Sequence, residues 1–401
     1  MNGRRDVAVV LSGGGVNGVL VELGFPKRLR RSPLWDRVAV VFGTSAGALV
    51  GAMAATDRLD EVEQFLLALR PEQTFRPHRL WRLPFLGLHD YALPDTIRTW
   101  FGDVEALAAQ LSIAPAELVV LATDLTDDQK TVADGFELAY SSRSTPPDVM
   151  AQAILASAAI SALVMPLRVG DRIATDGSWT RNYPLGPAYD HDEVELIVAF
   201  RYLPMYPRLG IDAFRQLERR LERFRRIPPI RAFLAELADA RARAERGEPA
   251  HLGDMMLRLA RVSVLRNTEL EERFANEKDE SLRELHALRR DVAALVSDAD
   301  LRRRIDARFA GARFPFRHDR AIPRITVRGR LTGPGLEAGF RTHQPWTVEA
   351  KRRIVDDGYR LADAELTPVE AALWGEDGSV EDDGRPRSSD EPVESGTTDG
   401  A

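Results

Sequence analysis

The sequence predicts an α/β protein in which a mostly parallel sheet lies between layers of helices. Short, almost wholly apolar runs alternate with helical patterns through the first half of the chain, as buried parallel strands joined by helices do. Two of these runs, residues 7–11 and 38–42, are each followed by a glycine-containing turn and then by a helical pattern. With 401 residues, the chain is long enough for one large domain and an appendage.

The first predicted strand runs into a glycine-rich loop. Residues 7–11 (VAVVL) precede residues 12–18 (SGGGVNG), and Val19, Leu20 and Leu23 then follow a helical spacing. A glycine loop between a strand and a helix directs several backbone N–H groups towards one point. Phosphate-binding loops and oxyanion holes both require this arrangement.

The same loop matches the dinucleotide-binding pattern G-x-G-x-x-G at Gly13, Gly15 and Gly18. A dinucleotide site also requires an acidic residue about 20 positions further on, at the end of the second strand, to bind a ribose hydroxyl. The second strand of this chain ends in Phe42 and Gly43, with no carboxylate. Nucleotide binding therefore stays a minor alternative.

The second predicted strand leads into Gly43-Thr44-Ser45-Ala46-Gly47. The G-x-S-x-G spacing is typical of a nucleophile elbow, in which Gly43 and Gly47 allow a sharp turn that exposes the hydroxyl of Ser45. The small-residue helix expected after it directs its positive end at the serine, which favours developing negative charge there. For the pentapeptide alone, a tight turn without chemistry is the alternative.

The alternation of strands and helices continues after the elbow. Residues 75–91, rich in arginine and aromatic residues, interrupt it; we interpret them as an irregular loop over the core, with contact to lipid headgroups or nucleic acid as the alternative. The expected elements are helices at residues 60–69, 94–101 and 147–159, buried strands at 118–125 and 195–200, a strand or hairpin at 132–140, and a hairpin at 169–174.

The second half of the chain changes to long, charged helices over residues 211–309. Their arginine-rich amphipathic pattern is compatible with an anionic membrane surface, but a packed helical lid or flank is the preferred interpretation. Residues 255–265 are apolar enough to be buried. A late strand at residues 323–327 and an amphipathic helix at residues 347–361 are expected to return to the core.

Composition excludes several kinds of site. The chain has no cysteine, which rules out disulfides, cysteine nucleophiles and thiolate metal sites, and no ligand cluster indicates a metal or a cofactor. The net charge is −6, but residues 375–401 hold nine acidic residues against two arginines and few large apolar residues. This tail is predicted to be disordered because it cannot bury enough apolar surface to fold.

No membrane-spanning or leader segment is apparent in the sequence. The apolar run at residues 7–11 is too short for the core of a signal peptide, and no stretch of 18 uninterrupted apolar residues occurs. We therefore expect a soluble, cytoplasmic protein. Peripheral contact with a membrane stays open.

Four motifs in order identify a family resemblance. They are the glycine loop at residues 13–18, the elbow at residues 43–47, Ser157-Ala158-Ala159-Ile160, and Asp176-Gly177-Ser178. In this order and spacing, residues 6–205 resemble the patatin-like phospholipases. The resemblance implies a three-layer α/β/α fold and lipid acyl hydrolysis by a serine–aspartate dyad. It assigns Ser45 as nucleophile, Asp176 as its partner, and an oxyanion hole to Gly13, Gly14, Gly15 and Gly18.

The chain departs from the family pattern at three positions. The family usually has Arg or Lys where Asn17 stands, Pro where Ser161 stands, and Gly or Ala where Ser178 stands. None of these changes removes a catalytic atom, because the oxyanion donors are backbone N–H groups. The absent basic side chain at Asn17 bears on loop rigidity and headgroup preference.

A Ser–Asp–His triad is the catalytic alternative. Its members follow that order along the chain in α/β-hydrolases. A serine on the second strand, with a glycine loop on the first, suits the dyad better, and each histidine is interpreted as a surface or loop residue. The histidines after Asp176 are His191, His251, His286, His318 and His343.

The sequence thus predicts a serine acyl hydrolase that cleaves fatty-acyl esters of phospholipids, lysophospholipids or related lipids through an acyl-enzyme. The alternative is a non-catalytic protein of the same fold that binds lipids or partners. A lipid acyl ester is the expected substrate, with no metal, cofactor or nucleic acid; the oligomeric state is not predicted.

The expected division of the chain is a catalytic core at residues 6–205, an Arg-rich helical insertion or lid at 211–310, a late strand and C-terminal helix at 320–370, and the acidic tail at 375–401.

Overall fold

The computed structural model describes most of the chain. The predicted acidic tail, most of the arginine- and aromatic-rich segment, and Ser161 lie outside the described residues, as do His251, His318 and His343. The described ranges are residues 4–77, 89–127, 135–160, 164–203, 211–249, 252–312, 321–333, 335–336 and 346–374.

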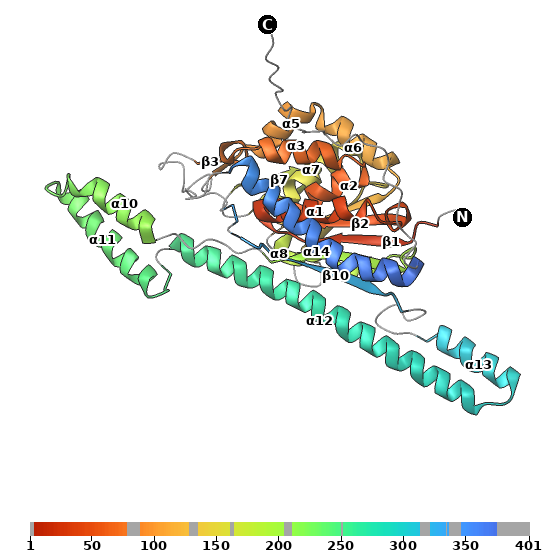
Figure 1. Cartoon of the computed structure of the whole chain (residues 1–401). Helices are drawn as coiled ribbons and strands as arrows, with labels where there is room; N and C mark the ends of the chain where they lie inside the picture. The colour runs from red at the N-terminus through yellow and green to blue at the C-terminus, as the bar shows by residue number, and fades with distance from the viewer. Residues whose placement is uncertain are drawn as a thin grey trace, which may run out of the picture.

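An eight-stranded sheet forms the centre of the molecule (Figure 1). Its order is β10-β9-β1-β2-β5-β8-β7, and β6 also pairs with β5. The five strands from β10 to β5 are parallel, β6 and β8 pair antiparallel with β5, and β7 pairs antiparallel with β8. The predicted mostly parallel sheet is confirmed. The strands are β1 (Val7–Leu11), β2 (Val38–Thr44), β5 (Glu117–Asp124), β6 (Glu137–Ser141), β7 (Leu167–Val169), β8 (Arg172–Asp176), β9 (Leu196–Tyr202) and β10 (Arg324–Gly329).

Helices cover both faces of this sheet. Alternate residues of β1 point to opposite faces, so Val9 belongs to one buried cluster and Val10 to another. The first cluster includes residues of α1 (Gly15–Leu29), α2 (Ala46–Ala55), α3 (Leu59–Ala68) and α14 (Val348–Trp374); the second includes residues of α9 (Leu185–Asp190) and α12 (Leu252–Leu295). The remaining helices are α5 (Leu93–Phe101), α6 (Val104–Ile113), α7 (Pro147–Ser157), α8 (Ser178–Arg181), α10 (Ile211–Glu222), α11 (Pro228–Glu245) and α13 (Ala299–Ala310). Two short 3-10 helices, η1 (Trp35–Arg37) and η2 (Pro71–Gln73), and a small hairpin of β3 (Phe75–Pro77) and β4 (His89–Tyr91) complete the described elements.

The late strand joins the sheet, as predicted, but the helices of the second half differ from expectation. Residues 255–265 do not form a buried element of their own; they belong to the 44-residue helix α12, and Met255, Leu259 and Val262 are exposed. The expectation of burial was wrong because a helix that crosses the surface of a domain buries only one stripe, here including Val264. Among the described residues, no helix has the length and apolar character needed to cross a membrane.

Helices α1 and α14 pack with their backbones in close contact. A Cβ atom added at Gly358 of α14 would lie 1.7 Å from the carbonyl oxygen of Val21, and one added at Gly24 of α1 would lie 2.1 Å from that of Val355. No side chain fits at either position. The two glycines therefore allow α14, from the end of the described chain, to pack against the first helix.

Candidate active site

The turn between β2 and α2 has the strained geometry of a nucleophile elbow. Ser45 lies between the end of β2 and the start of α2 with φ 55° and ψ −116°, a conformation that non-glycine residues rarely adopt. Its N–H donates to Ser157 Oγ at 2.9 Å, and that hydroxyl donates to the carbonyl oxygen of Leu121 at 2.6 Å. These two bonds hold the turn against the neighbouring strand.

Both elbow glycines are required by close backbone contacts. A Cβ atom at Gly43 would lie 2.5 Å from the carbonyl oxygen of Gly47, and one at Gly47 would lie 2.6 Å from that of Leu11. Real Cβ atoms do not come this close to backbone oxygens. The G-x-S-x-G spacing is thus explained by the packing of α2 against β1 and β2.

The sheet register brings Asp176 to the same place. Strand β2 pairs with β5 as far as Thr44, which faces Leu121. The next residue of β5, Ala122, faces Asp176 at the end of β8. Since Ser45 follows Thr44 directly, the serine and the aspartate become neighbours although 131 residues separate them.

The two side chains are joined by a direct hydrogen bond. Ser45 Oγ donates to Asp176 Oδ2 at 2.7 Å, and the backbone N–H of Ser178 donates to Asp176 Oδ1 at 2.8 Å. Burial raises the pKa of the Asp176 carboxyl, and the hydrogen bonds from Ser45 and Ser178 lower it by less, so the pKa stays above its usual value. A carboxylate with a raised pKa is a stronger proton acceptor for a serine hydroxyl.

The glycine loop lies beside Ser45, but only part of it has free N–H groups. The N–H of Gly13 donates to the carbonyl oxygen of Asn182 at 3.0 Å, and that of Gly18 donates to Gly14, also at 3.0 Å. These two predicted oxyanion donors are therefore occupied by protein carbonyls. The N–H groups of Gly14 and Gly15 have no acceptor within the described part of the chain, and Gly15 begins α1 with φ +61°. Of the four glycines predicted to form an oxyanion hole, Gly14 and Gly15 are therefore the two that remain candidates.

Comparison with known proteins relates part of the chain to one family. Residues 9–189 match the model of the family described as patatin-like phospholipase. These residues are a patatin-like domain. The crystal structure of VipD from Legionella pneumophila is similar at a TM-score of 0.38 with 12% sequence identity, over 90% of this chain and 67% of that chain. None of the curated proteins matches the chain.

The long helix α12 is hydrogen-bonded to the patatin-like domain at the site. Asn267 Oδ1 accepts from the N–H of Asn182 at 3.2 Å, and Thr268 Oγ1 accepts from Asn182 Nδ2 at 2.9 Å. Asn267 Nδ2 also donates to the carbonyl oxygen of Ser178 at 2.6 Å. Because Asn182 holds Gly13, α12 braces both the glycine loop and the aspartate turn. Sequence reasoning missed these residues, since nothing local marks a contact across more than 80 positions.

We expect Thr268→Val to lower the free energy of unfolding by about 1–3 kcal/mol, because the buried Asn182 amide loses its acceptor. Acyl-ester turnover should fall as well, because Asn182 positions Gly13. Denaturant unfolding and kcat measure the two effects. Thr99→Val is the matched control: both threonines donate to the carbonyl four residues earlier, but Thr99 is exposed and should change stability by less than about 0.5 kcal/mol. Equal effects would contradict the bracing role.

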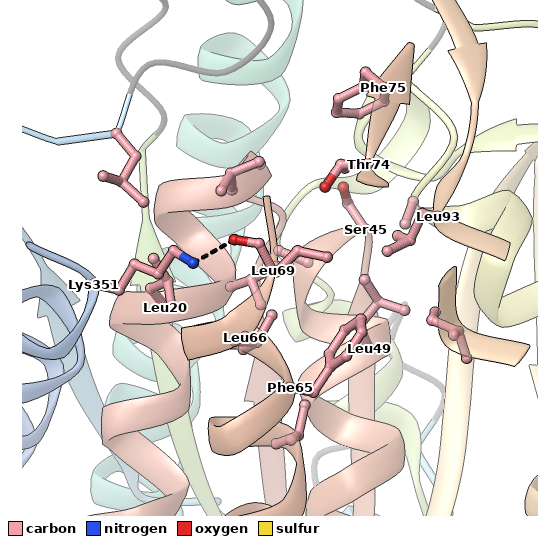
Figure 2. Close-up of a pocket in the computed structure, with 18 of the residues that line it drawn as sticks. Leu20, Ser45, Leu49, Phe65, Leu66, Leu69, Thr74, Phe75, Leu93 and Lys351 are labelled. Carbon is pink, nitrogen blue, oxygen red and sulfur yellow. Dashed lines mark hydrogen bonds between the residues drawn. The ribbon is translucent and has the colours of Figure 1, made fainter. Parts of the chain in front are cut away.

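An apolar pocket extends from Ser45 between α1, α2, α3 and α5 (Figure 2). Residues from outside the matched family segment complete its wall, among them Leu336, Trp346 and Lys351. Asn17, which replaces the basic residue of the family, accepts from the N–H of Leu336 at 2.6 Å and so fixes that wall. Other lining residues include Leu20, Leu49, Phe65, Leu66, Leu69, Thr74, Phe75 and Leu93.

Lys351 is the charged group of this pocket wall. Its ammonium donates to the carbonyl oxygens of Leu67 and Leu69, at the C-terminal end of α3, and lies 5.8 Å from the centre of the Trp346 ring. Burial lowers the pKa of Lys351 to about 8. Through these hydrogen bonds, Lys351 links α14 to α3. Its positive charge also interacts favourably with the negative C-terminal end of the α3 dipole.

Ser45 Oγ and Asp176 Oδ2 touch directly at 2.7 Å, and no described histidine takes part in this contact. Among the described histidines that follow Asp176, His191 lies 3.6 Å from Glu117 at the start of β5, and His286 packs against Phe309 with the two rings tilted at 54°. Groups of three or more potential metal ligands are likewise absent from the described ranges.

Proposed function

We propose that this protein is a serine acyl hydrolase that cleaves fatty-acyl esters of phospholipids or lysophospholipids, with Ser45 and Asp176 as a catalytic dyad. The family supports lipid acyl hydrolysis in general. The observation that carries the finer proposal is the 2.7 Å hydrogen bond from Ser45 Oγ to the buried Asp176 carboxylate, at one end of an apolar pocket.

The reaction follows from this arrangement. Ser45 Oγ attacks the ester carbonyl while Asp176 accepts its proton, and the N–H groups of Gly14 and Gly15 stabilise the tetrahedral oxyanion. Asp176 then gives the proton to the leaving alkoxide, which departs as an alcohol and leaves the acyl group on Ser45. A water molecule, deprotonated by Asp176, attacks the acyl-enzyme and releases the fatty acid, and Asp176 returns the proton to Ser45 Oγ.

We propose that the acyl chain of the substrate lies in this pocket. Leu49 and Phe65 line it together with Ser45, so a chain bound there presents its ester carbon at the open hydroxyl (Figure 2). Burial of about 0.8 kcal/mol per methylene favours long acyl groups over short ones. The predicted boundaries, a core at residues 6–205, an insertion at 211–310 and a returning segment at 320–370, remain part of the proposal.

A fluorophosphonate probe tests the proposal directly. Labelled protein is digested and the modified peptide located by mass spectrometry, while fatty-acid release from phosphatidylcholine and lysophosphatidylcholine is followed in parallel. We expect the adduct on Ser45 together with acyl release. A folded protein that neither labels nor releases fatty acid would instead be a non-catalytic lipid-binding protein.

The pH dependence of hydrolysis should report Asp176. The carboxylate must be ionised to accept a proton, and burial raises its pKa, so kcat/KM should fall with decreasing pH at a midpoint above that of an exposed aspartate, about 3.9. Ser178→Ala removes a side-chain hydrogen bond that lowers this pKa and should move the midpoint upwards. The measurement is kcat/KM of a soluble short-chain ester against pH. A midpoint at or below about 3.9 would exclude Asp176 as the base.

A further inference from the structure

The turn that joins α10 to α11 exposes large apolar side chains between arginines. We name residues 220–233, which include this turn, the hairpin tip. Phe224 is 41% exposed, Ile227 46% and Phe233 46%. Side chains of this size are normally covered in a soluble domain, and here they occur within ten positions of one another. The arginines of the tip are Arg220, Arg223, Arg225, Arg226 and Arg231, all exposed.

Most of the positive charge of the tip is not neutralised. The tip contains one acidic residue, Glu222, which pairs with Arg225 at 3.0 Å. Among the described residues, no carboxylate lies within ion-pair distance of Arg220, Arg226 or Arg231. A chain with a net charge of −6 thus carries a concentrated basic patch at this place.

The base of the same hairpin is built differently. Arg241 pairs with Glu218 at 2.9 Å and with Glu245 at 3.0 Å, and Arg215 pairs with Glu245 at 3.4 Å. Leu237 and Ala240 of α11 are buried. Ion pairs therefore hold the two helices together at the base, whereas the arginines and large apolar side chains of the tip are exposed.

The hairpin projects towards the side of the molecule on which the candidate active site lies. Strand β1 starts on the side of the N-terminus, and α10 and α11 extend from the opposite side (Figure 1). Because β2 is parallel to β1, Ser45 at its C-terminal end lies on that opposite side as well. A surface bound by the tip would thus face the edge of the sheet that carries the site.

We propose that the hairpin tip docks the protein on an anionic phospholipid bilayer. Phe224, Ile227 and Phe233 enter the boundary between headgroups and acyl chains, and the arginines donate to lipid phosphates, for which the guanidinium fork is well shaped. The proposal rests on the proposed function, because a phospholipid hydrolase must reach substrate within a bilayer. The aliphatic Ile227 favours a lipid surface over a nucleic acid, which would offer it no apolar partner.

Vesicle sedimentation with the full chain tests the docking. Wild type should bind phosphatidylcholine vesicles that contain phosphatidylglycerol at least about tenfold more tightly than pure phosphatidylcholine vesicles. Each arginine near an anionic surface contributes roughly fivefold, so Arg220→Gln, Arg226→Gln and Arg231→Gln together should weaken binding about 100-fold. Phe224→Ser with Ile227→Ser should weaken it on both kinds of vesicle.

The matched control makes the same charge change on α13, with Arg303→Gln, Arg304→Gln and Arg308→Gln. These exposed arginines lie at the far end of α12 from the hairpin (Figure 1). The control should bind as wild type does. If both triple variants lose affinity equally, or if wild type binds single-stranded nucleic acid and not anionic vesicles, the docking proposal is wrong.

A soluble ester separates the docking from the chemistry. The tip variants should hydrolyse a monomeric short-chain ester at the wild-type rate but release fatty acid from anionic vesicles more slowly. Vesicle binding without hydrolysis of any ester would overturn the proposed function and support the docking. Ester hydrolysis with vesicle affinity unchanged in the tip variants would overturn the docking alone.

Discussion

Replacement of Ser45 by alanine is expected to abolish fluorophosphonate labelling and to lower kcat/KM for an acyl ester by about 10⁴-fold or more, because it removes the hydroxyl that we propose forms the acyl-enzyme. Asp176→Asn should lower it by a similar factor, since an amide cannot accept the proton of Ser45 Oγ. The shape of the side chain and its contact with Ser178 are retained in that variant. A loss of activity in Asp176→Asn would therefore be due to the missing proton acceptor and not to a changed shape of the site.

Asp176→Asn should also change stability, in the opposite direction to activity. The folded-state pKa of Asp176 lies above its unfolded-state value, so wild-type stability falls as the pH rises through the folded-state pKa and the buried carboxyl ionises. The amide cannot ionise. At neutral pH the variant should therefore unfold at a higher denaturant concentration than wild type, and the difference should shrink as the pH is lowered. An inactive variant with unchanged or lower stability at neutral pH would argue against a buried, ionised carboxylate.

Gly358→Ala is expected to cost about 3 kcal/mol or more of unfolding free energy. The added Cβ would lie 1.7 Å from the carbonyl oxygen of Val21, a backbone atom in the middle of α1 that cannot rotate away. Helix α14 would have to separate from α1. Since α14 carries Lys351, the wall of the pocket would move as well.

Denaturant unfolding measures this effect, and hydrogen exchange of α1 amides locates it. Ala364→Gly, at an exposed position of the same helix, is the control and should cost only about 1 kcal/mol through the lower helix propensity of glycine. If Gly358→Ala destabilises the protein no more than the control, the two helices do not pack backbone to backbone.

The candidate nucleophile and its loop could be predicted from sequence because their requirements are local. A sharp turn with a strained central residue demands small neighbours, and Gly43 and Gly47 stand at the two places where a Cβ would strike backbone oxygens. The buried strand before each turn is a continuous apolar run, the pattern of a strand covered on both faces. The sequence alone thus determined the elbow around Ser45, the glycine loop and the mostly parallel sheet.

The parts that sequence reasoning missed all depend on contacts between distant segments. Only the folded chain shows that Asn182 occupies the N–H of Gly13, that Thr268 holds Asn182, and that Asn17 fixes Leu336 in the pocket wall. Each is an ordinary polar or apolar residue in its own stretch of chain. Its role arises from a partner between about 80 and 320 positions away, and no local spacing encodes such a pairing.

Sequence by itself therefore determined the turn around Ser45, and the tertiary structure decided what surrounds it. The backbone conformation of a turn is set by the few residues that form it, so the spacing of the glycines predicts the turn. Packing of helices such as α12 and α14 against the first strands decides three features of the site. These are which N–H groups of the glycine loop stay free, which helix braces the site, and which residues form the pocket walls. That packing depends on contacts between segments far apart in the chain. The turn around Ser45 can therefore be predicted from local sequence, but the residues that hold it in place cannot.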